Sequence, residues 1–133
     1  MKLTVTSLAS GSSGNALLVQ NGTTALLVDC GLSQRAIERA LAHASLSPTE
    51  LTALLLTHEH GDHAGCAGPF ARRYGIPVLT NASTAMALHS VLAGVQLELL
   101  DTGTETELGC FHVRSFSIAH DACLLYTSDA ADE

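Results

Sequence analysis

The sequence predicts a mixed α/β (α+β) fold, and two observations support this prediction. Short segments rich in apolar and β-branched residues are separated by turn-forming residues, as expected of strands. Two longer segments, 34–43 and 82–92, have the composition of helices instead. With 133 residues, of which 47% are hydrophobic, the chain is long enough to form about one domain with its own core.

Three strands are predicted near the N-terminus, over residues 3–8, 16–20 and 24–29. Asn21-Gly22 is the residue pair preferred in two-residue hairpin turns, so the second and third strands should be neighbours in a sheet. The first two strands are joined by the small-residue loop 10–15.

Helices and strands are expected to alternate along the rest of the chain. Ser33 is placed to cap a helix over 34–43, and Ser47-Pro48 breaks the chain before a strand over 51–57. A helix over 65–74 ends at Gly75, and one over 82–92 is capped by Asn81. The remaining strands are predicted at 77–80, 96–100, 105–108 and 111–118.

Composition limits the location and the partners of the protein. The sequence contains no run of the roughly 18 to 20 apolar residues that would cross a bilayer and no apolar leader at its start, so we expect no membrane contact and a cytoplasmic location. A formal charge of −7 argues by itself against a nucleic-acid surface, since Arg72-Arg73 is the main local cluster of basic residues. Bound metal ions would weaken that objection, because they supply positive charge at the site itself.

The four cysteines do not indicate a thiolate metal site. Cys30, Cys66, Cys110 and Cys123 are scattered without a Cys-x-x-Cys spacing. We interpret them as reduced, partly buried thiols, although Cys30 follows Asp29 closely enough to approach a site there.

The strongest functional indication is the segment Thr57–His63, which follows the apolar run Leu51–Leu56 and contains three imidazoles and the carboxylate of Asp62. In an extended chain His58 and His60 project to one face and can reach the same ion. Asp62 and His63 come after Gly61, where the chain can turn, and can address a second position. A merely polar surface stretch is the alternative, but such stretches rarely follow a buried strand. The spacing therefore predicts half of a two-metal hydrolase site.

The His-x-His-x-Asp-His pattern resembles that of the metallo-β-lactamase-fold hydrolases. Three further segments, 7–15, 27–33 and 117–122, resemble the YycJ (WalJ) branch in the same order, so that the resemblance covers about residues 3–122. It implies an αββα sandwich with a mixed or antiparallel sheet and flanking helices. This chain would hold the N-terminal half of that sandwich.

The resemblance also implies a set of metal ligands and supporting residues. His58, His60 and His120 would bind one metal, and Asp62 and His63 would bind the other, with Asp62 also acting in catalysis. Asp29 would orient a ligand histidine. Asp121 is a candidate on other grounds: it adjoins His120 and is placed to orient it, and a solvated surface acid is the equal alternative. Two divalent ions are expected, and the ligands suit Zn²⁺, Mn²⁺ or Fe²⁺. The family implies a bridging Asp and a last His as well, which have no counterpart after His120. No role is assigned to three other histidines, His43, His89 and His112.

The small-residue loop is a candidate for phosphate binding. Backbone N–H groups and hydroxyls in such a loop can surround an anion, although loops of this kind are more often simple tight turns. The residues concerned are Ser10, Gly11, Ser12, Ser13 and Asn15.

Residues 123–133 differ in character from what precedes them. Their sequence, CLLYTSDAADE, resembles the translation of a common sequencing adapter, so we expect residues 1–122 to be the native part of the domain and 123–133 to be a non-native tail. No function is assigned to that tail.

The function expected from these features is metal-dependent hydrolysis of phosphodiesters, with exonuclease action on DNA as the resemblance suggests. On its own, this chain should be weakly active or inactive. Two alternatives stay open at this point, a thioester or lactone hydrolase similar to glyoxalase II, and a non-catalytic metal-binding domain. The sequence does not indicate an oligomeric state.

Overall fold

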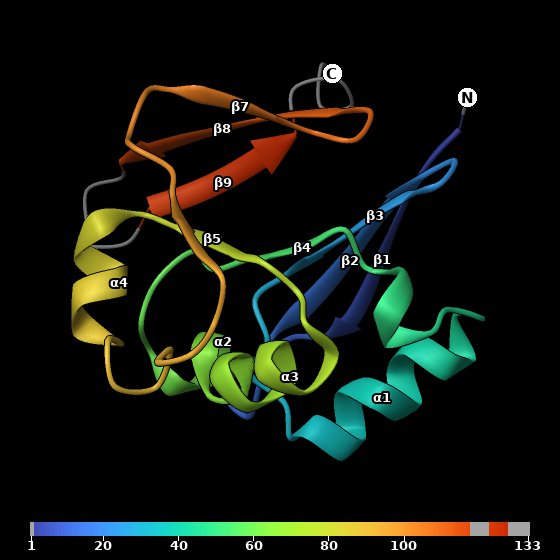
Figure 1. The fold of residues 1–133 in the computed structure, drawn as a ribbon. Coiled ribbons are helices and arrows are strands. Elements are labelled where there is room, and N and C mark those ends of the chain that lie inside the picture. Colours follow the sequence, from blue (N-terminus) through green and yellow to red (C-terminus); the bar gives the residue numbers. More distant parts are fainter. Residues whose placement is uncertain (1, 118–122, 128–133) are drawn as a thin grey trace.

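The computed structural model describes residues 2–117 and 123–127, which form two sheets and a layer of helices (Figure 1). The larger sheet has six strands in the order β1-β2-β3-β4-β5-β6, and the smaller has three in the order β7-β8-β9. The elements are β1 (Leu3–Ala9), β2 (Ala16–Asn21), β3 (Thr24–Val28), α1 (Gln34–His43), the 3-10 turn η1 (Pro48–Glu50), β4 (Ala53–Leu55), α2 (Gly61–Ala64), α3 (Ala67–Tyr74), β5 (Val78–Thr80), α4 (Ala82–Ala87), β6 (Leu97–Leu99), β7 (Glu105–Leu108), β8 (Phe111–Ser117) and β9 (Cys123–Thr127).

The six-stranded sheet changes from antiparallel to parallel pairing at β3. The predicted hairpin joins β2 to β3, with Gly22 at a φ of 64° in its turn. From β3 onward the strands pair in parallel, because helices cross over between them. The carboxyl ends of β3, β4 and β5 therefore meet at one edge of the sheet.

The two faces of this sheet pack against different layers. Side chains alternate along β3, so that Leu27 faces the helices and packs with Ile37 and Phe70. Its neighbour Leu26 faces the smaller sheet and packs with Phe111. The order of layers, helix on sheet on sheet, is that of the predicted αββα sandwich up to its second helical layer.

Local chemistry explains the elements that the sequence predicted well. Helix α1 has the predicted bounds, and the Ala36 amide donates to the Ser33 hydroxyl at 3.2 Å. Asn81 caps α4 in the same way, accepting from the Thr84 amide at 2.8 Å.

Three predicted elements differ from the observed ones by two or more residues at an end. The strand expected over 51–57 is limited to β4, although the Leu56 amide still bonds to the Leu79 carbonyl of the neighbouring strand. The helix expected over 65–74 is preceded by the separate short helix α2. The helix expected over 82–92 ends at Ala87, where the following turns direct the carbonyls of Val91 and Ala93 to Arg72.

The segment assigned to the tail contributes β9, which pairs with β8 antiparallel, with Phe116 opposite Leu124. This pairing does not bear on the origin of the segment, since an open strand edge accepts any chain with free backbone groups. Within the described part of the chain, every helix is too short or too polar to span a membrane.

Candidate metal centre

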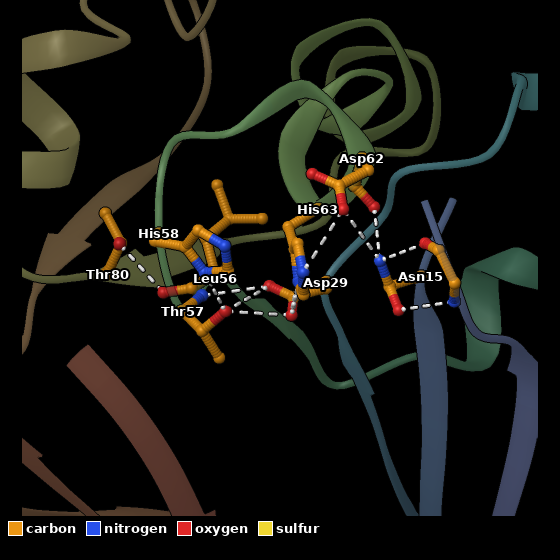
Figure 2. Close-up of polar contacts among 9 residues, drawn as sticks. Asn15, Asp29, Leu56, Thr57, His58, Asp62, His63 and Thr80 are labelled. Carbon is orange, nitrogen blue, oxygen red and sulfur yellow. Dashed lines mark hydrogen bonds and ion pairs between the residues drawn. The ribbon is translucent and has the colours of Figure 1, made fainter. Parts of the chain in front are cut away.

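The predicted ligands come together where β4 ends. His58 and His60 lie in the loop after β4, and Asp62 and His63 lie in α2 (Figure 2). The ring centroids of His58 and His60 are 4.7 Å apart, and those of His58 and His63 are 3.9 Å apart. The strand ends at Leu55, two residues earlier than predicted, and the loop that follows it brings the three imidazoles together.

The exit of the chain from β4 is held from the neighbouring strand. The Leu56 amide donates to the Leu79 carbonyl at 3.0 Å. The buried Thr80 hydroxyl donates to the Leu56 carbonyl at 2.9 Å (Figure 2). Both polar groups of Leu56 are therefore paired where the chain leaves the sheet, which fixes the start of the histidine-rich loop.

Asp29, directly after β3, is the centre of the polar network beneath the histidines. The residue is only 6% exposed, and its carboxylate accepts from the Thr57 amide at 2.9 Å and from the Thr57 hydroxyl at 2.9 Å. Its Oδ2 lies 2.7 Å from Nδ1 of His63. The residue has a φ of 66°, a left-handed conformation that costs energy for any residue with a side chain. Strain of this kind is typical of functional sites.

The contact with Asp29 determines which nitrogen of His63 is available. An ionised carboxylate can only accept, so the proton of the neutral imidazole lies on Nδ1 and the Nε2 lone pair is free for a metal. That Nε2 lies 3.7 Å from Oδ2 of Asp62. Two ligand atoms that each lie about 2.0 to 2.2 Å from one tetrahedral ion are about 3.3 to 3.6 Å apart, which is close to this separation. His63 and Asp62 thus fit the second metal position of the predicted site.

Asn15 connects the small-residue loop to Asp62. Its side-chain amide donates to Oδ2 of Asp62 at 3.2 Å, to the Asp62 carbonyl at 3.1 Å and to the Gly11 carbonyl at 2.9 Å (Figure 2). Its own amide donates to the Asp62 carbonyl at 2.7 Å. The sequence suggested phosphate contact for Asn15, whereas the structure shows its side chain engaged with the carboxylate of a predicted ligand.

The other predicted phosphate-binding residues of the loop keep their hydroxyls exposed. The Gly11 amide donates to Oδ1 of Asn15, and the Gly14 amide donates to the Gly11 carbonyl, so both amides are paired within the loop. Ser10, Ser12 and Ser13 are exposed. Phosphate contact by this loop stays a prediction that depends on the hydroxyls.

The described residues bring together only part of the predicted ligand set. Within 2–117 and 123–127, no three His, Cys, Asp or Glu side chains are arranged to hold one ion, and the pair Asp62 and His63 is the best-placed element. The predicted ligand His120 and its neighbour Asp121 lie outside the described residues. Three imidazoles and a carboxylate are nevertheless suitable donors for Zn²⁺, Mn²⁺ or Fe²⁺.

The electrostatics of the cluster favour a neutral His58. Burial, followed by the nearby His63, lowers the pKa of His58 from its usual range. The neutral imidazole is the form that binds metals.

Cys30 is buried next to Cys66. A hydrogen bond with Cys66 and burial raise the pKa of the Cys30 thiol above its usual range, which disfavours the thiolate.

The three histidines without an assigned role lie apart from the cluster. His43 ends α1, His89 follows α4 with Nδ1 3.3 Å from the Met86 carbonyl, and Nδ1 of His112 lies 3.4 Å from Glu105. Sequence reasoning missed one residue of the network, Thr57. Its position between Leu56 and His58 gave no indication beyond a hydroxyl next to a ligand.

Comparison with known proteins finds a matching family profile and similar curated proteins. The profile described as the metallo-beta-lactamase superfamily matches residues 9–109. The chain is 37% identical over 118 residues to the exodeoxyribonuclease YycJ of Bacillus anthracis, and 37% identical over 120 residues to the exodeoxyribonuclease WalJ of Streptococcus pneumoniae serotype 2. Each match covers 86% of this chain and 45% of the relative, so the chain spans less than half the length of these curated relatives.

Solved structures support the fold at low identity. A metallo-β-lactamase with a HARLDQ motif from Cronobacter sakazakii matches with a TM-score of 0.76 at 15% identity, over 89% of this chain and 54% of that one. The class B3 di-zinc metallo-β-lactamase LRA-12 from an Alaskan soil metagenome matches with a TM-score of 0.71 at 17% identity, over 86% and 52%.

Proposed function

Because this chain belongs to the metallo-β-lactamase superfamily, a superfamily of hydrolases, we propose that it is part of a metal-dependent phosphodiesterase that acts as an exonuclease on DNA. The observation that carries the proposal is the proximity of Nε2 of His63 to the Asp62 carboxylate, while Nδ1 of the same ring contacts Asp29. The choice of DNA as substrate is supported by the two relatives named as exodeoxyribonucleases.

The described ligands divide between two positions. His58 and His60, joined by His120, would hold one ion, and Asp62 and His63 would hold the other. Two divalent ions would supply a nucleophile from water at neutral pH and would neutralise charge on a phosphoryl group. The metal is Zn²⁺, Mn²⁺ or Fe²⁺ in this proposal. Asp121 would support His120, as expected from the sequence.

Substrate binding has to overcome the acidity of the chain. A protein with a formal charge of −7 would repel DNA unless cations are concentrated where the phosphate binds. The exposed Ser12 and Ser13 lie on the loop that Asn15 ties to Asp62, so their hydroxyls are near the proposed position of the second ion. We assign the contact with the substrate phosphate to these two side chains.

The proposal concerns a protein of the length of the curated relatives, because this chain spans 45% of it. A suitable test protein is a chimera in which residues 3–117 of this chain replace the equivalent part of the Bacillus anthracis relative. The relative then supplies the ligands that the described residues lack.

The test measures nucleotide release from a 5′-phosphorylated DNA duplex with Mn²⁺ or Zn²⁺, and hydrolysis of a glutathione thioester in parallel. We expect DNA hydrolysis that EDTA abolishes and that falls at least about 100-fold in the variants Asp62→Asn and His63→Gln. The matched control is His89→Gln, a histidine remote from the cluster, which should keep parental activity. Thioester hydrolysis without DNA hydrolysis would contradict the proposal and favour the glyoxalase II-like alternative. Metal binding without either activity would contradict it in favour of a non-catalytic metal-binding domain.

A further inference from the structure

The hydroxyl of Thr57 lies between the Asp29 carboxylate and the His58 imidazole. Its Oγ1 is 2.9 Å from Oδ2 of Asp29 and 2.8 Å from Nδ1 of His58 (Figure 2). A threonine hydroxyl has one proton to donate and lone pairs with which to accept. Its single proton can serve only one of these two neighbours.

The carboxylate decides where that proton goes. Asp29 is buried and, when ionised, can only accept, so a hydroxyl lone pair facing it at 2.9 Å would be repelled. The Thr57 hydroxyl therefore donates to Asp29, and it is left to accept from His58. Acceptance requires that the proton of the neutral His58 ring is on Nδ1, which leaves the lone pair on Nε2.

We propose that Thr57 is a positioning residue that relays the Asp29 carboxylate to His58, so that one carboxylate fixes the proton position on two histidines. Asp29 acts on His63 directly, through the 2.7 Å contact with Nδ1, and on His58 through the hydroxyl. Both rings then present Nε2. In the proposed function the two histidines bind different metal ions, and the purpose of the relay rests on that proposed function. The relay itself concerns the metal-free chain.

The two carboxylate oxygens of Asp29 have different sets of partners. Oδ1 accepts from the Thr57 backbone amide, a donor that cannot reverse its role, and it also lies 3.1 Å from the Thr57 hydroxyl. Oδ2 faces both the Thr57 hydroxyl, at 2.9 Å, and Nδ1 of His63. In the variant Asp29→Asn the amide oxygen is thus held at the Oδ1 position, and the amide NH₂ takes the Oδ2 position as a donor. Asparagine also tolerates the left-handed backbone of residue 29.

Nuclear magnetic resonance of the metal-free, ¹⁵N-labelled chain tests the relay, at a pH at which the imidazoles are neutral. Correlations between ring nitrogens and carbon-bound ring protons show which nitrogen carries hydrogen. We expect the Nδ1–H form for both His58 and His63 in the parent chain. In Thr57→Val the proton of His58 should move to Nε2 to a large extent, while His63 keeps Nδ1–H because its contact with Asp29 is direct.

Two further variants separate a relay from a general structural role. Thr57→Ser keeps the hydroxyl and should reproduce the parent. Asp29→Asn, in which the amide NH₂ faces Nδ1 of His63, should move the proton of His63 to Nε2. The relay is overturned if His58 has the same form in Thr57→Val as in the parent, if Thr57→Ser behaves like Thr57→Val, or if Thr57→Val changes His63 as well. Should Thr57→Val not fold, an Nε2–H form of His58 in the parent would overturn it equally. DNA hydrolysis is not part of the readout, so failure of the proposed function would leave this result distinct.

Discussion

Oδ2 of Asp29 lies 2.7 Å from Nδ1 of His63, although the two residues are 34 positions apart in the chain. Parallel pairing of β3 with β4 produces this contact, because it places the residues that follow the two strands side by side at one edge of the sheet. A carboxylate at the end of one strand can thus orient an imidazole carried by the loop and helix after the next. The pairing of these two strands is what positions Asp29 beside His63.

Substitutions at Asp29 should separate its contribution to stability from its contribution to metal binding. Asp29→Ala leaves the buried amide and hydroxyl of Thr57 without their acceptor, and we expect a loss of roughly 1–3 kcal/mol in the free energy of unfolding. Asp29→Asn keeps an acceptor for the amide and should cost less. Urea denaturation of both variants measures these values. Equal stability of Asp29→Ala and the parent would contradict the network.

Asn15 should affect the affinity for metal more than the stability of the fold. Asn15→Ala removes the amide that donates to Oδ2 of Asp62, but keeps the backbone bond from residue 15 to the Asp62 carbonyl. Loss of an outer partner of a ligand typically costs about 10–100-fold in metal affinity, and we expect a change of this size. Competition with a chromophoric chelator measures the affinity for Zn²⁺.

Ser12→Ala is the matched control for Asn15→Ala, since Ser12 is on the same loop and exposed. It should leave the affinity for Zn²⁺ at the parental value, because its predicted partner is the substrate phosphate and not a ligand. A decrease of equal size in both variants would attribute the effect to the loop as a whole, contrary to the assignment of Asn15.

Local chemistry determined which parts of the fold could be predicted. The Asn21-Gly22 turn and the Ser33 cap depend on residues within a few positions of each other, and both are confirmed. The helix over 82–92 was predicted too long. After Ala87 the chain forms turns whose carbonyls, at Val91 and Ala93, accept hydrogen bonds from Arg72, a residue distant in sequence. Tertiary contacts of this kind leave no periodic pattern in the sequence.

The candidate site was predictable in its ligands but not in its connections. The spacing of His58, His60, Asp62 and His63 is visible in the sequence, and the structure brings the imidazoles together. The direction of a side-chain amide is set by packing between segments that are far apart in the sequence. Asn15 and Asp62, for example, are separated by 47 positions. Such a contact depends on the register of the sheet, which cannot be worked out from local patterns in the sequence.

The lowered pKa of His58 predicts how stability depends on pH. Burial favours the neutral ring in the folded chain, while in the unfolded chain the ring has its usual pKa of about 6.5. The associated stability is complete above that value, and it is lost as the pH falls through it toward the lowered pKa of the folded state. Urea denaturation in EDTA should show the free energy of unfolding decreasing between about pH 7 and pH 5. In His58→Gln this decrease should be smaller, and an identical decrease in both proteins would contradict the effect of burial.

Two glycines near the ligands should respond in opposite ways to alanine. A Cβ at Gly31 would lie 1.9 Å from the Asp62 carbonyl oxygen, so Gly31→Ala has to push α2 away from the end of β3. We expect a loss on the order of 1–3 kcal/mol in the free energy of unfolding, together with weaker Zn²⁺ binding, because Asp62 moves with its backbone.

Gly61 is part of the histidine motif itself, yet a Cβ there meets nothing within 4 Å, and its φ is not among the positive values of the chain. Since alanine favours a helix over glycine by up to about 1 kcal/mol, Gly61→Ala should leave stability unchanged or raise it, with parental affinity for Zn²⁺. Urea denaturation and chelator competition on both variants make the comparison. If Gly61→Ala lost metal binding while Gly31→Ala kept it, the turn at Gly61, and not the close packing of Gly31 on Asp62, would position the ligand.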